Sequence, residues 1–149
     1  MSAALTLATP DHLNGLLALV ASYHVEAGIK STDDSRRKGV VPLLDGIPYG
    51  CAYLIGPARA PIGYIVITFS WSVKFGGLDG IVDELYMRPG VRGRGIASEA
   101  LNALPRALAG AGLRAVHLEV DKDNAAALKL YRRAGFVPRD AYMMMSKRL

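Results

Sequence analysis

Hydrophobic and polar positions change spacing several times along the chain, and each change marks a boundary between predicted elements. Residues 3–8 form a short apolar run that predicts a strand. Thr9 is a suitable helix N-cap, and apolar positions at helical spacing follow it as far as Gly28, which should end the helix. The polar segment 30–38 predicts a loop that leads into a short helix before Pro42.

The middle of the chain carries strand signals. Residues 51–55 and 62–70 are rich in β-branched and aromatic residues, and the intervening sequence Gly-Pro-Ala-Arg-Ala-Pro predicts a hairpin turn. These two strands should pair antiparallel. Residues 73–80 are rich in glycine and predict a loop, after which a strand is expected over residues 81–87.

The second half alternates between helical and strand spacing. It predicts a helix over 94–109, a strand over 115–120, a helix over 125–134 and a last strand over 142–147. This order predicts an α/β fold whose mixed, mostly antiparallel central sheet is flanked by helices on both faces. With 149 residues the chain can build one core, so we expect a single domain over residues 1–149.

Composition narrows the class of protein. Hydrophobic residues make up 51% of the chain and charged residues 21%, which is typical of a soluble domain. The apolar runs are far shorter than the roughly 20 residues of a membrane-spanning helix, and no signal-type leader opens the chain. Cys51 is the only cysteine, which excludes a disulfide framework. We therefore expect a cytoplasmic protein with no membrane partner.

Charge is distributed unevenly. Residues 1–87 carry 6 basic and 8 acidic side chains, a net −2, whereas residues 88–149 carry 12 and 5, a net +7. The basic half favours an anionic ligand. Aromatic residues are only 7% and no long Lys/Arg tract occurs, so a small phosphorylated ligand is a better interpretation than a nucleic acid.

A glycine-paired segment joins a predicted strand to a predicted helix. It reads Arg92, Gly93, Arg94, Gly95, Ile96 and Ala97. Glycines let a ligand approach the backbone closely, and the free N–H groups at a helix N-terminus attract anions. A P-loop would need Lys-Ser or Lys-Thr after the last glycine, which this segment lacks. A dinucleotide-binding fingerprint fits poorly, because Ser98 occupies the position of its third small residue.

These residues resemble the GNAT family of acetyl-CoA-dependent N-acetyltransferases, whose pyrophosphate loop reads Q/R-x-x-G-x-G/A. Arg92, Gly95 and Ala97 satisfy this pattern. A second family pattern, N-x-x-A-x-x-L-Y-x-x-x-G-F, is satisfied by Asn124, Ala127, Leu130, Tyr131, Gly135 and Phe136. The resemblance covers residues 81–149, and the order of elements before them is also that of the family.

The resemblance implies that acetyl-CoA is the acetyl donor and that an amine is the acceptor. The backbone N–H groups of the Arg92–Ala97 segment would bind the pyrophosphate of CoA. The strand before it would pair its backbone with the pantetheine arm through Leu85, Tyr86 and Met87. Asn124 and Ala127 would lie along the pantetheine, and Tyr131 beside the sulfur. The family also implies that the strands at 85–87 and 118–120 splay apart, and it allows a homodimer.

Acetyl transfer to an amine requires a neutral nucleophile. A lysine-like amine with a pKa of about 10.4 lies roughly 3.4 units above neutral pH, a cost of about 4.6 kcal/mol. Glu84, just before the loop, is the leading candidate for the base, and its alternative is a contact with a cationic substrate. Asp83 is expected on the opposite face of the strand. Tyr131 is the candidate acid for the departing thiolate, and its alternative is a core aromatic residue.

Other polar residues carry weaker signals. No metal site is expected, because the three histidines have no spacing typical of one, and we assign no role to His12, His24 or His117. Four residues could line an acceptor pocket, with ordinary strand-end packing as their alternative: Glu26, Ser70, Trp71 and Ser72.

The sequence therefore leads to the hypothesis of an N-acetyltransferase that moves an acetyl group from acetyl-CoA to a primary amine of a small molecule by direct attack. The first alternative is a protein or peptide N-acetyltransferase. The second is a catalytically silent CoA-binding interaction module, and a dinucleotide-binding domain is a third.

Overall fold

The structure is a computed structural model that describes residues 4–149. The chain forms two compact units, one ending at Glu119 and one spanning Val120–Leu149, and each is described by itself. The single domain over residues 1–149 stays a prediction.

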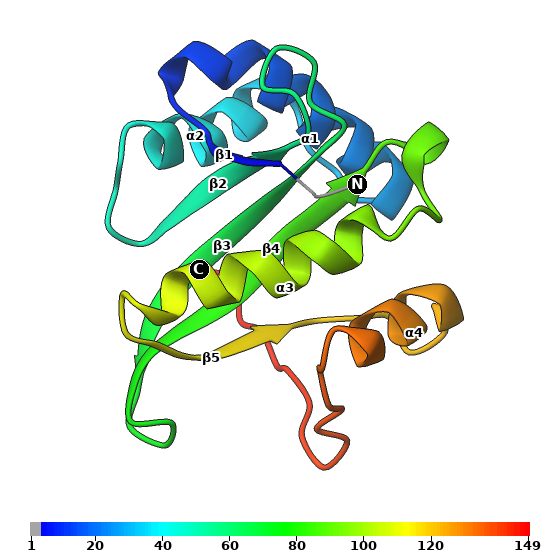
Figure 1. Cartoon of the computed structure of the whole chain (residues 1–149). Helices are drawn as coiled ribbons and strands as arrows, with labels where there is room; N and C mark the ends of the chain where they lie inside the picture. The colour runs from blue at the N-terminus through cyan, green and yellow to red at the C-terminus, as the bar shows by residue number, and fades with distance from the viewer. Residues whose placement is uncertain (1–3) are drawn as a thin grey trace. The chain divides into compact units, whose positions relative to one another are not determined.

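The first unit contains a five-stranded sheet and three α-helices (Figure 1). Two short 3-10 turns, η1 (Pro10–His12) and η2 (Pro89–Val91), precede α1 and α3. In chain order the main elements are β1 (Leu5–Leu7), α1 (Leu13–Ala27), α2 (Asp33–Leu44), β2 (Gly50–Ile55), β3 (Gly63–Ser72), β4 (Gly77–Met87), α3 (Ile96–Ala109) and β5 (Leu113–Leu118).

The strands follow the order β1-β2-β3-β4-β5 across the sheet. The first four pair antiparallel, and β5 runs parallel to β4. The β4–β5 pairing runs from Leu78 opposite Leu113 to Val82 opposite Leu118, so the rest of β4 extends past the paired region. The predicted mostly antiparallel sheet with splayed central strands is confirmed.

Strand β3 lies at the centre of the core. Tyr64, Ile65 and Ile67 are fully buried and Val66 is 6% exposed. Because successive strand side chains point to opposite faces, four buried residues in a row require cover on both faces. Helices α1 and α2 cover one face, and α3 covers the other (Figure 1). The predicted helices on both faces are confirmed.

The loop predicted over residues 30–38 is wrong, because α2 begins at Asp33. Thr32 caps it in a capping box, in which the Ser35 N–H donates to Thr32 Oγ1 at 3.1 Å and the Thr32 N–H donates to Ser35 Oγ at 2.8 Å. Asp33 and Asp34 then suit the positive end of the helix dipole. The polar residues that suggested a loop are therefore the cap and first turn of a helix, which continues through Pro42.

The loop predicted over residues 73–80 is also too long, because β4 begins at Gly77. A Cβ on Gly80 would lie 3.1 Å from Ile67 Cδ1 and 3.2 Å from Leu113 Cδ1. Gly80 is thus an interior strand residue that leaves room for neighbouring side chains. Only the short turn before Gly77, where Gly76 has φ +78°, matches the predicted loop.

The second unit contains α4 (Ala125–Arg133), within the predicted range 125–134. Asn124 caps its start, since Asn124 Oδ1 accepts the Ala127 N–H at 3.1 Å. At its end Gly135 has φ +91°, its N–H donates to Arg132 O, and the Phe136 N–H donates to Tyr131 O. This pair of bonds is a Schellman motif, whose usual apolar contact is made here by the Tyr131 and Phe136 rings, 6.1 Å apart.

Two strand predictions differ from the structure. The strand predicted over 142–147 is wrong, because this part of the described chain forms no strand, and Met143 and Met145 are 82% and 81% exposed. An isolated apolar run cannot make a strand without a partner to receive its backbone hydrogen bonds. The strand predicted over 115–120 lies two residues earlier, as β5. Of the strand predicted over 3–8, Ala3 lies outside the described residues.

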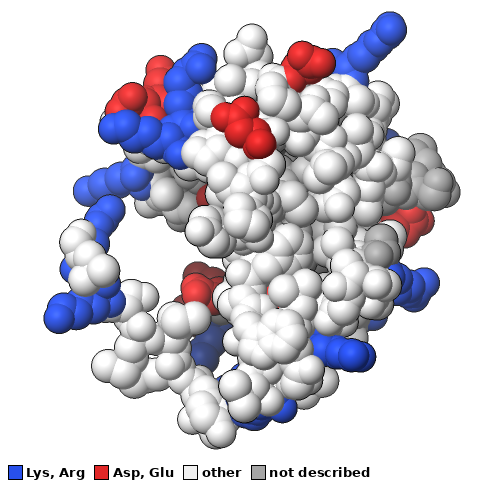
Figure 2. All heavy atoms as spheres, turned by 90° about the vertical axis from the view of Figure 1, so that its left-hand side faces the viewer, with Lys and Arg blue, Asp and Glu red and all other residues white. Residues whose placement is uncertain are grey.

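The surface carries both signs of charge. On the face seen in Figure 2, acidic and basic side chains are interspersed on a mostly uncharged surface. On α2, for example, Lys38 pairs with Asp34 at 3.1 Å. Within residues 4–149, no helix has the length and apolar character needed to cross a membrane.

Candidate active site

The glycine-paired segment forms the connection between β4 and α3. It leaves the 3-10 turn η2 and places Gly93 at φ +80° and Gly95 at φ +77°. Side chains with a Cβ rarely adopt this left-handed conformation, so both glycines are needed for the backbone path. A Cβ on either glycine would meet no atom within 4 Å, so the backbone is open to a ligand.

The N-terminus of α3 offers free donors at this connection. The first helical hydrogen bond runs from the Glu99 N–H to Gly95 O at 3.1 Å. The N–H groups of residues 96–98 therefore have no acceptor inside the helix. Together with the helix dipole, these donors form a site that favours an anion such as a phosphate. The helix predicted over 94–109 begins two residues later than predicted, at Ile96, so Arg94 lies in the exposed loop.

Arg92 is held by an acidic residue of α1. Its guanidinium donates to both carboxylate oxygens of Glu26, at 2.5 and 2.7 Å, and its Nε donates to Met87 O at 2.9 Å. The same guanidinium lies 5.5 Å from the centre of the Tyr86 ring. The hydrogen bond from Arg92 lowers the pKa of Glu26 below its ordinary value. Arg92 is thus compensated locally, whereas Arg94 lies exposed in the loop.

The end of β4 presents backbone groups on the side that β5 does not cover. The Arg88 N–H donates to Ile62 O at 2.8 Å, toward β3. Because backbone groups alternate along a strand, Tyr86 also faces β3, whereas Leu85 and Met87 face the other edge. Arg92 already uses Met87 O there. This leaves the N–H and C=O of Leu85 and the N–H of Met87 at the splayed edge.

A bulge in β4 sets the direction of Glu84. Val66 lies opposite Glu84 and Ile67 opposite Val82, so Asp83 is an extra residue in β4. In a regular strand Glu84 would share the face of Val82. The bulge instead turns it to the face of Val66, which packs in the core beneath α1 and α2.

The Glu84 carboxylate accepts two hydrogen bonds. Tyr64 Oη donates to Oε1 at 2.7 Å, and His24 Nε2 lies 2.7 Å from Oε2. Burial first, and then the charge of Glu84, raises the pKa of Tyr64 far above its ordinary value, so the phenol keeps its proton and acts as a donor. The carboxylate is fixed from two sides, with its side chain 18% exposed.

His24, to which the sequence interpretation assigned no role, contacts the candidate base Glu84. Its side chain is only 13% exposed, and its Nδ1 lies 2.7 Å from Ser31 Oγ. Arg36 in turn donates to Ser31 Oγ at 2.8 Å. One signal could have indicated this placement: His24 lies four residues after Val20 and eight after Leu16, on the buried stripe of α1.

The Asp83 carboxylate, where β4 and β5 separate, is under the influence of two other carboxylates. Partial burial, and then the charges of Glu84 and Glu119, raise the pKa of Asp83, while His24 acts in the opposite direction. Negative charge is therefore crowded beside the splayed edge of β4. A positively charged group bound there would relieve the repulsion.

The comparison with known proteins decides the family. A sequence model of the acetyltransferase (GNAT) family matches residues 22–136, which include both patterns identified in the sequence. The chain belongs to the acetyltransferase (GNAT) family.

Relatives of this GNAT chain share sequence or fold. "Acetyltransferase SG1711" of Sodalis glossinidius (strain morsitans) is 32% identical over 77 residues, which cover 50% of the chain and 54% of that protein. The chain thus spans about half the length of this curated relative. The integron cassette protein HFX_CASS3, from the mobile metagenome of Cole Harbour Salt Marsh, has a TM-score of 0.84 and 29% identity, covering 97% of this chain and 90% of its own.

A third relative shares the GNAT fold at low identity. The solved structure of AAC(6')-Iy in complex with the bisubstrate analogue CoA-S-monomethyl-acetylneamine has a TM-score of 0.81 at 15% identity, covering 100% of both chains. AAC(6')-Iy is an aminoglycoside N-acetyltransferase. At this identity the likeness shows the fold alone.

The second GNAT pattern has a structural explanation within its own unit. Asn124 and Ala127 form the N-cap bond of α4, and Tyr131, Gly135 and Phe136 form its C-terminal motif. Burial raises the pKa of Tyr131, so its phenol stays protonated near neutral pH. The pattern therefore specifies both ends of a nine-residue helix as well as presenting a phenol.

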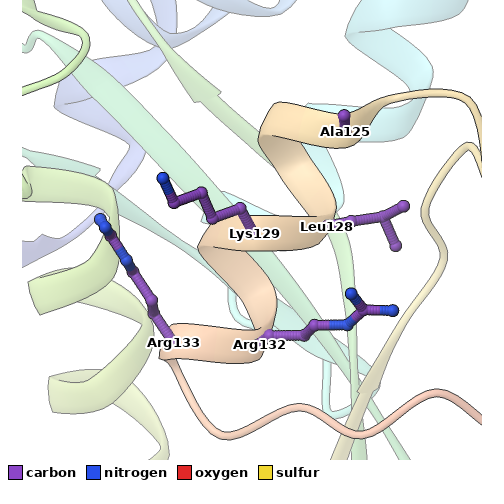
Figure 3. Close-up of a pocket in the computed structure, with 5 residues that line it drawn as sticks. All are labelled: Ala125, Leu128, Lys129, Arg132 and Arg133. Carbon is purple, nitrogen blue, oxygen red and sulfur yellow. The ribbon is translucent and has the colours of Figure 1, made fainter.

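Helix α4 also carries basic side chains. Lys129 and Arg133, one turn apart, extend to the same side of the helix, whereas Arg132 extends with Leu128 to another (Figure 3). Together with Ala125 they line a surface pocket. An anion could bind there by charge attraction.

The predicted acceptor-pocket residues are not brought together. Trp71 is 74% exposed near the end of β3, and Ser72 Oγ accepts the Phe75 N–H in the β3–β4 turn. Glu26 instead binds Arg92. Among residues 4–149, no group of three or more His, Cys, Asp or Glu side chains has an arrangement that could hold a metal ion.

Proposed function

We propose that this GNAT domain transfers an acetyl group from acetyl-CoA to a primary amine of a small, positively charged molecule. One observation carries the proposal. Beyond Val82 the splayed edge of β4 offers free backbone groups next to the crowded carboxylates of Asp83, Glu84 and Glu119. A donor can lie along this edge while an ammonium approaches the carboxylates.

The residues of the first unit fit acetyl-CoA. The N–H groups of residues 96–98 suit a pyrophosphate, and the backbone of Leu85 and Met87 suits the amide groups of a pantetheine arm. Acetyl-CoA supplies the activated acetyl group. Asn124, Ala127 and Tyr131 are assigned to donor binding only through the family pattern.

Glu84 is the proposed base. An ammonium acceptor must lose a proton before it attacks, and Glu84 is held by two donors with part of its side chain still exposed. The proton passes from the ammonium to the carboxylate directly or through one water. Tyr131 is the proposed acid for the departing thiolate, because the family pattern assigns it to the sulfur and a phenol carries a proton at neutral pH.

An acceptor panel tests the function. Purified protein is incubated with acetyl-CoA and with polyamines, aminoglycosides, amino acids or peptides, and free CoA thiol is measured. Turnover with a small cationic amine is expected. Acetylation of peptides alone would contradict the small-molecule proposal, and binding of acetyl-CoA without turnover on any amine would indicate a silent module.

The pH profile then tests Glu84. Glu84→Gln should lower the rate most near neutral pH and progressively less at alkaline pH, where the amine loses its proton unaided. A uniform loss across the range would assign Glu84 to acceptor positioning.

A further inference from the structure

The most informative unexplained feature is the polar chain behind Glu84. It links five segments of the first unit: Glu84 on β4, Tyr64 on β3, His24 on α1, Ser31 in the α1–α2 connection and Arg36 on α2. His24 and Arg36 are 13% and 14% exposed. Burying polar side chains costs free energy unless their hydrogen bonds are satisfied. We therefore expect this chain of hydrogen bonds to have a role beyond packing.

The hydrogen bonds of this chain are compatible with one continuous direction of donation, from Arg36 through Ser31 and His24 to Glu84. Arg36 has no acceptor atom, so it must donate to Ser31 Oγ. The Ser31 hydroxyl is then free to donate to His24 Nδ1. An imidazole that accepts at Nδ1 carries its proton on Nε2, and this N–H points at the carboxylate of Glu84.

Arg36 is itself fixed at the far end. Asp33, in the first turn of α2, pairs with the Arg36 guanidinium. The orientation of Arg36 is thereby set by the capped start of α2. The other charged or titratable groups facing His24 are Asp83 on β4 and Tyr23 beside it on α1, whose ring centre lies 5.9 Å away.

We propose that His24 is a positioning residue that holds Glu84 in its reactive orientation, and that Ser31 and Arg36 act through His24 by selecting its Nε2-protonated tautomer. Without Ser31, the tautomer protonated on Nδ1 leaves a lone pair facing the carboxylate, which repels Glu84 from its position. This inference rests on the proposed function, since it assigns Glu84 as the base.

Three variants separate positioning from folding. His24→Asn is too short to reach Glu84, whereas His24→Gln places an amide N–H near the position of Nε2. Ser31→Ala removes the donor that selects the tautomer. Ser22→Ala is the matched control, because within residues 4–149 the hydrogen bond of Ser22 Oγ goes to Ala18 O on the same helix.

In the kinetic test, His24→Asn should lower kcat by roughly 10–100-fold, the scale of a small misplacement of a reacting group, with the KM for acetyl-CoA unchanged. His24→Gln should restore much of the rate. Ser31→Ala should lower kcat in the wild-type background but add no further loss to His24→Asn, because the two act through one path. Equal losses in both backgrounds, or a wild-type rate in His24→Asn, would overturn the proposal.

A second measurement does not need activity. Nitrogen NMR of the imidazole should show His24 as the Nε2-protonated neutral tautomer in the full chain, assigned by the signals that His24→Asn removes. Ser31→Ala should shift it toward the Nδ1-protonated form, and Ser22→Ala should not. If no acceptor is turned over but the tautomer responds, the proposed function fails and the tautomer selection stands; an Nδ1-protonated His24 in the wild-type chain would overturn the selection itself.

Discussion

Tyr131 combines two physical roles in one side chain. Its ring completes the Schellman motif of α4 by contacting Phe136, while its phenol, whose pKa is raised by burial, carries a proton at neutral pH. The ring and the hydroxyl can therefore be tested separately. A change that keeps the ring leaves the helix end intact and removes only the proton.

We predict that Tyr131→Phe retains acetyl-CoA binding and the thermal unfolding midpoint but lowers turnover by roughly 10²-fold, the usual scale for a general acid. Tyr49→Phe removes the same atom from a tyrosine that is 70% exposed, and it should leave turnover unchanged. Binding calorimetry and initial rates measure both. An unaltered rate in Tyr131→Phe would reduce Tyr131 to its packing role.

Asp83 is a residue at which charge opposes stability. A carboxyl whose folded-state pKa is raised binds its proton more tightly in the folded state than in the unfolded state. Its ionised form therefore costs stability at neutral pH, and this cost decreases as pH falls below the folded-state pKa and is gone below the unfolded-state pKa.

Asp83→Asn should accordingly raise the unfolding free energy at pH 7, by no more than about 1 kcal/mol because the side chain is partly exposed. The gain over wild type should shrink as pH falls below the raised pKa. Asp140→Asn, in an exposed part of the second unit, is the control. Thermal unfolding at several pH values measures the difference, and a destabilised Asp83→Asn would argue against charge repulsion at the β4 edge.

At the scale of elements, the β4–α3 connection depends on backbone conformation. Gly95 has φ +77° and Gly90 does not have a positive φ, yet a Cβ at either would meet open space. The two glycines therefore differ in conformation and not in crowding. The same substitution at Gly95 and at Gly90 therefore measures the effect of the positive φ alone.

Gly95→Ala should destabilise the fold by about 1 kcal/mol and weaken acetyl-CoA binding, because the loop relaxes away from its left-handed turn. Gly90→Ala should change neither by much. Calorimetry with acetyl-CoA and thermal unfolding separate the two effects. If a folded Gly95→Ala variant binds acetyl-CoA with full affinity, donor binding does not depend on the left-handed turn of this loop.

Helix α1 and strands β2 and β3 were predictable because local spacing and turn residues determine them. The starts of α2 and β4 were not, because the polar residues and the glycines there suggested loops. Polar residues at Thr32 and Asp33 act as a cap, and Gly80 makes room for Ile67 and Leu113, which only the tertiary neighbours reveal. The strand expected over 142–147 failed because a strand also needs a partner.

At the scale of the whole molecule, the sequence located the loop and Glu84 but not what surrounds Glu84. His24 lies 60 residues before Glu84, and Glu26 lies 66 residues before Arg92. Such contacts depend on how the last turn of α1 crosses β4, and on a bulge at Asp83 that changes the face of one side chain. Neither leaves a periodic signal, so residue spacing alone could not find them.

The basic second half of the chain should make acetyl-CoA binding depend on salt. Residues 88–149 carry a net +7, from 12 basic and 5 acidic side chains, and acetyl-CoA is a polyanion. Added salt shortens the range of exposed charges, from roughly 10 Å at 0.1 M to 3 Å at 1 M, so acetyl-CoA should bind several-fold more weakly at high salt. Within the loop, Arg94 should account for more of this effect than Arg92, because Glu26 already compensates Arg92.

Arg94→Gln should therefore weaken acetyl-CoA binding at low salt and flatten its salt dependence, whereas Arg92→Gln should have the smaller effect on both. Gln at position 92 also satisfies the family's loop pattern. Lys74→Gln, in the exposed β3–β4 turn at the other end of β4, removes one positive charge and should bind like wild type. Titration calorimetry at two salt concentrations measures all four proteins. If Arg92→Gln loses more affinity than Arg94→Gln, Arg92 leaves Glu26 to reach the donor, and the pairing seen here belongs to the free protein only.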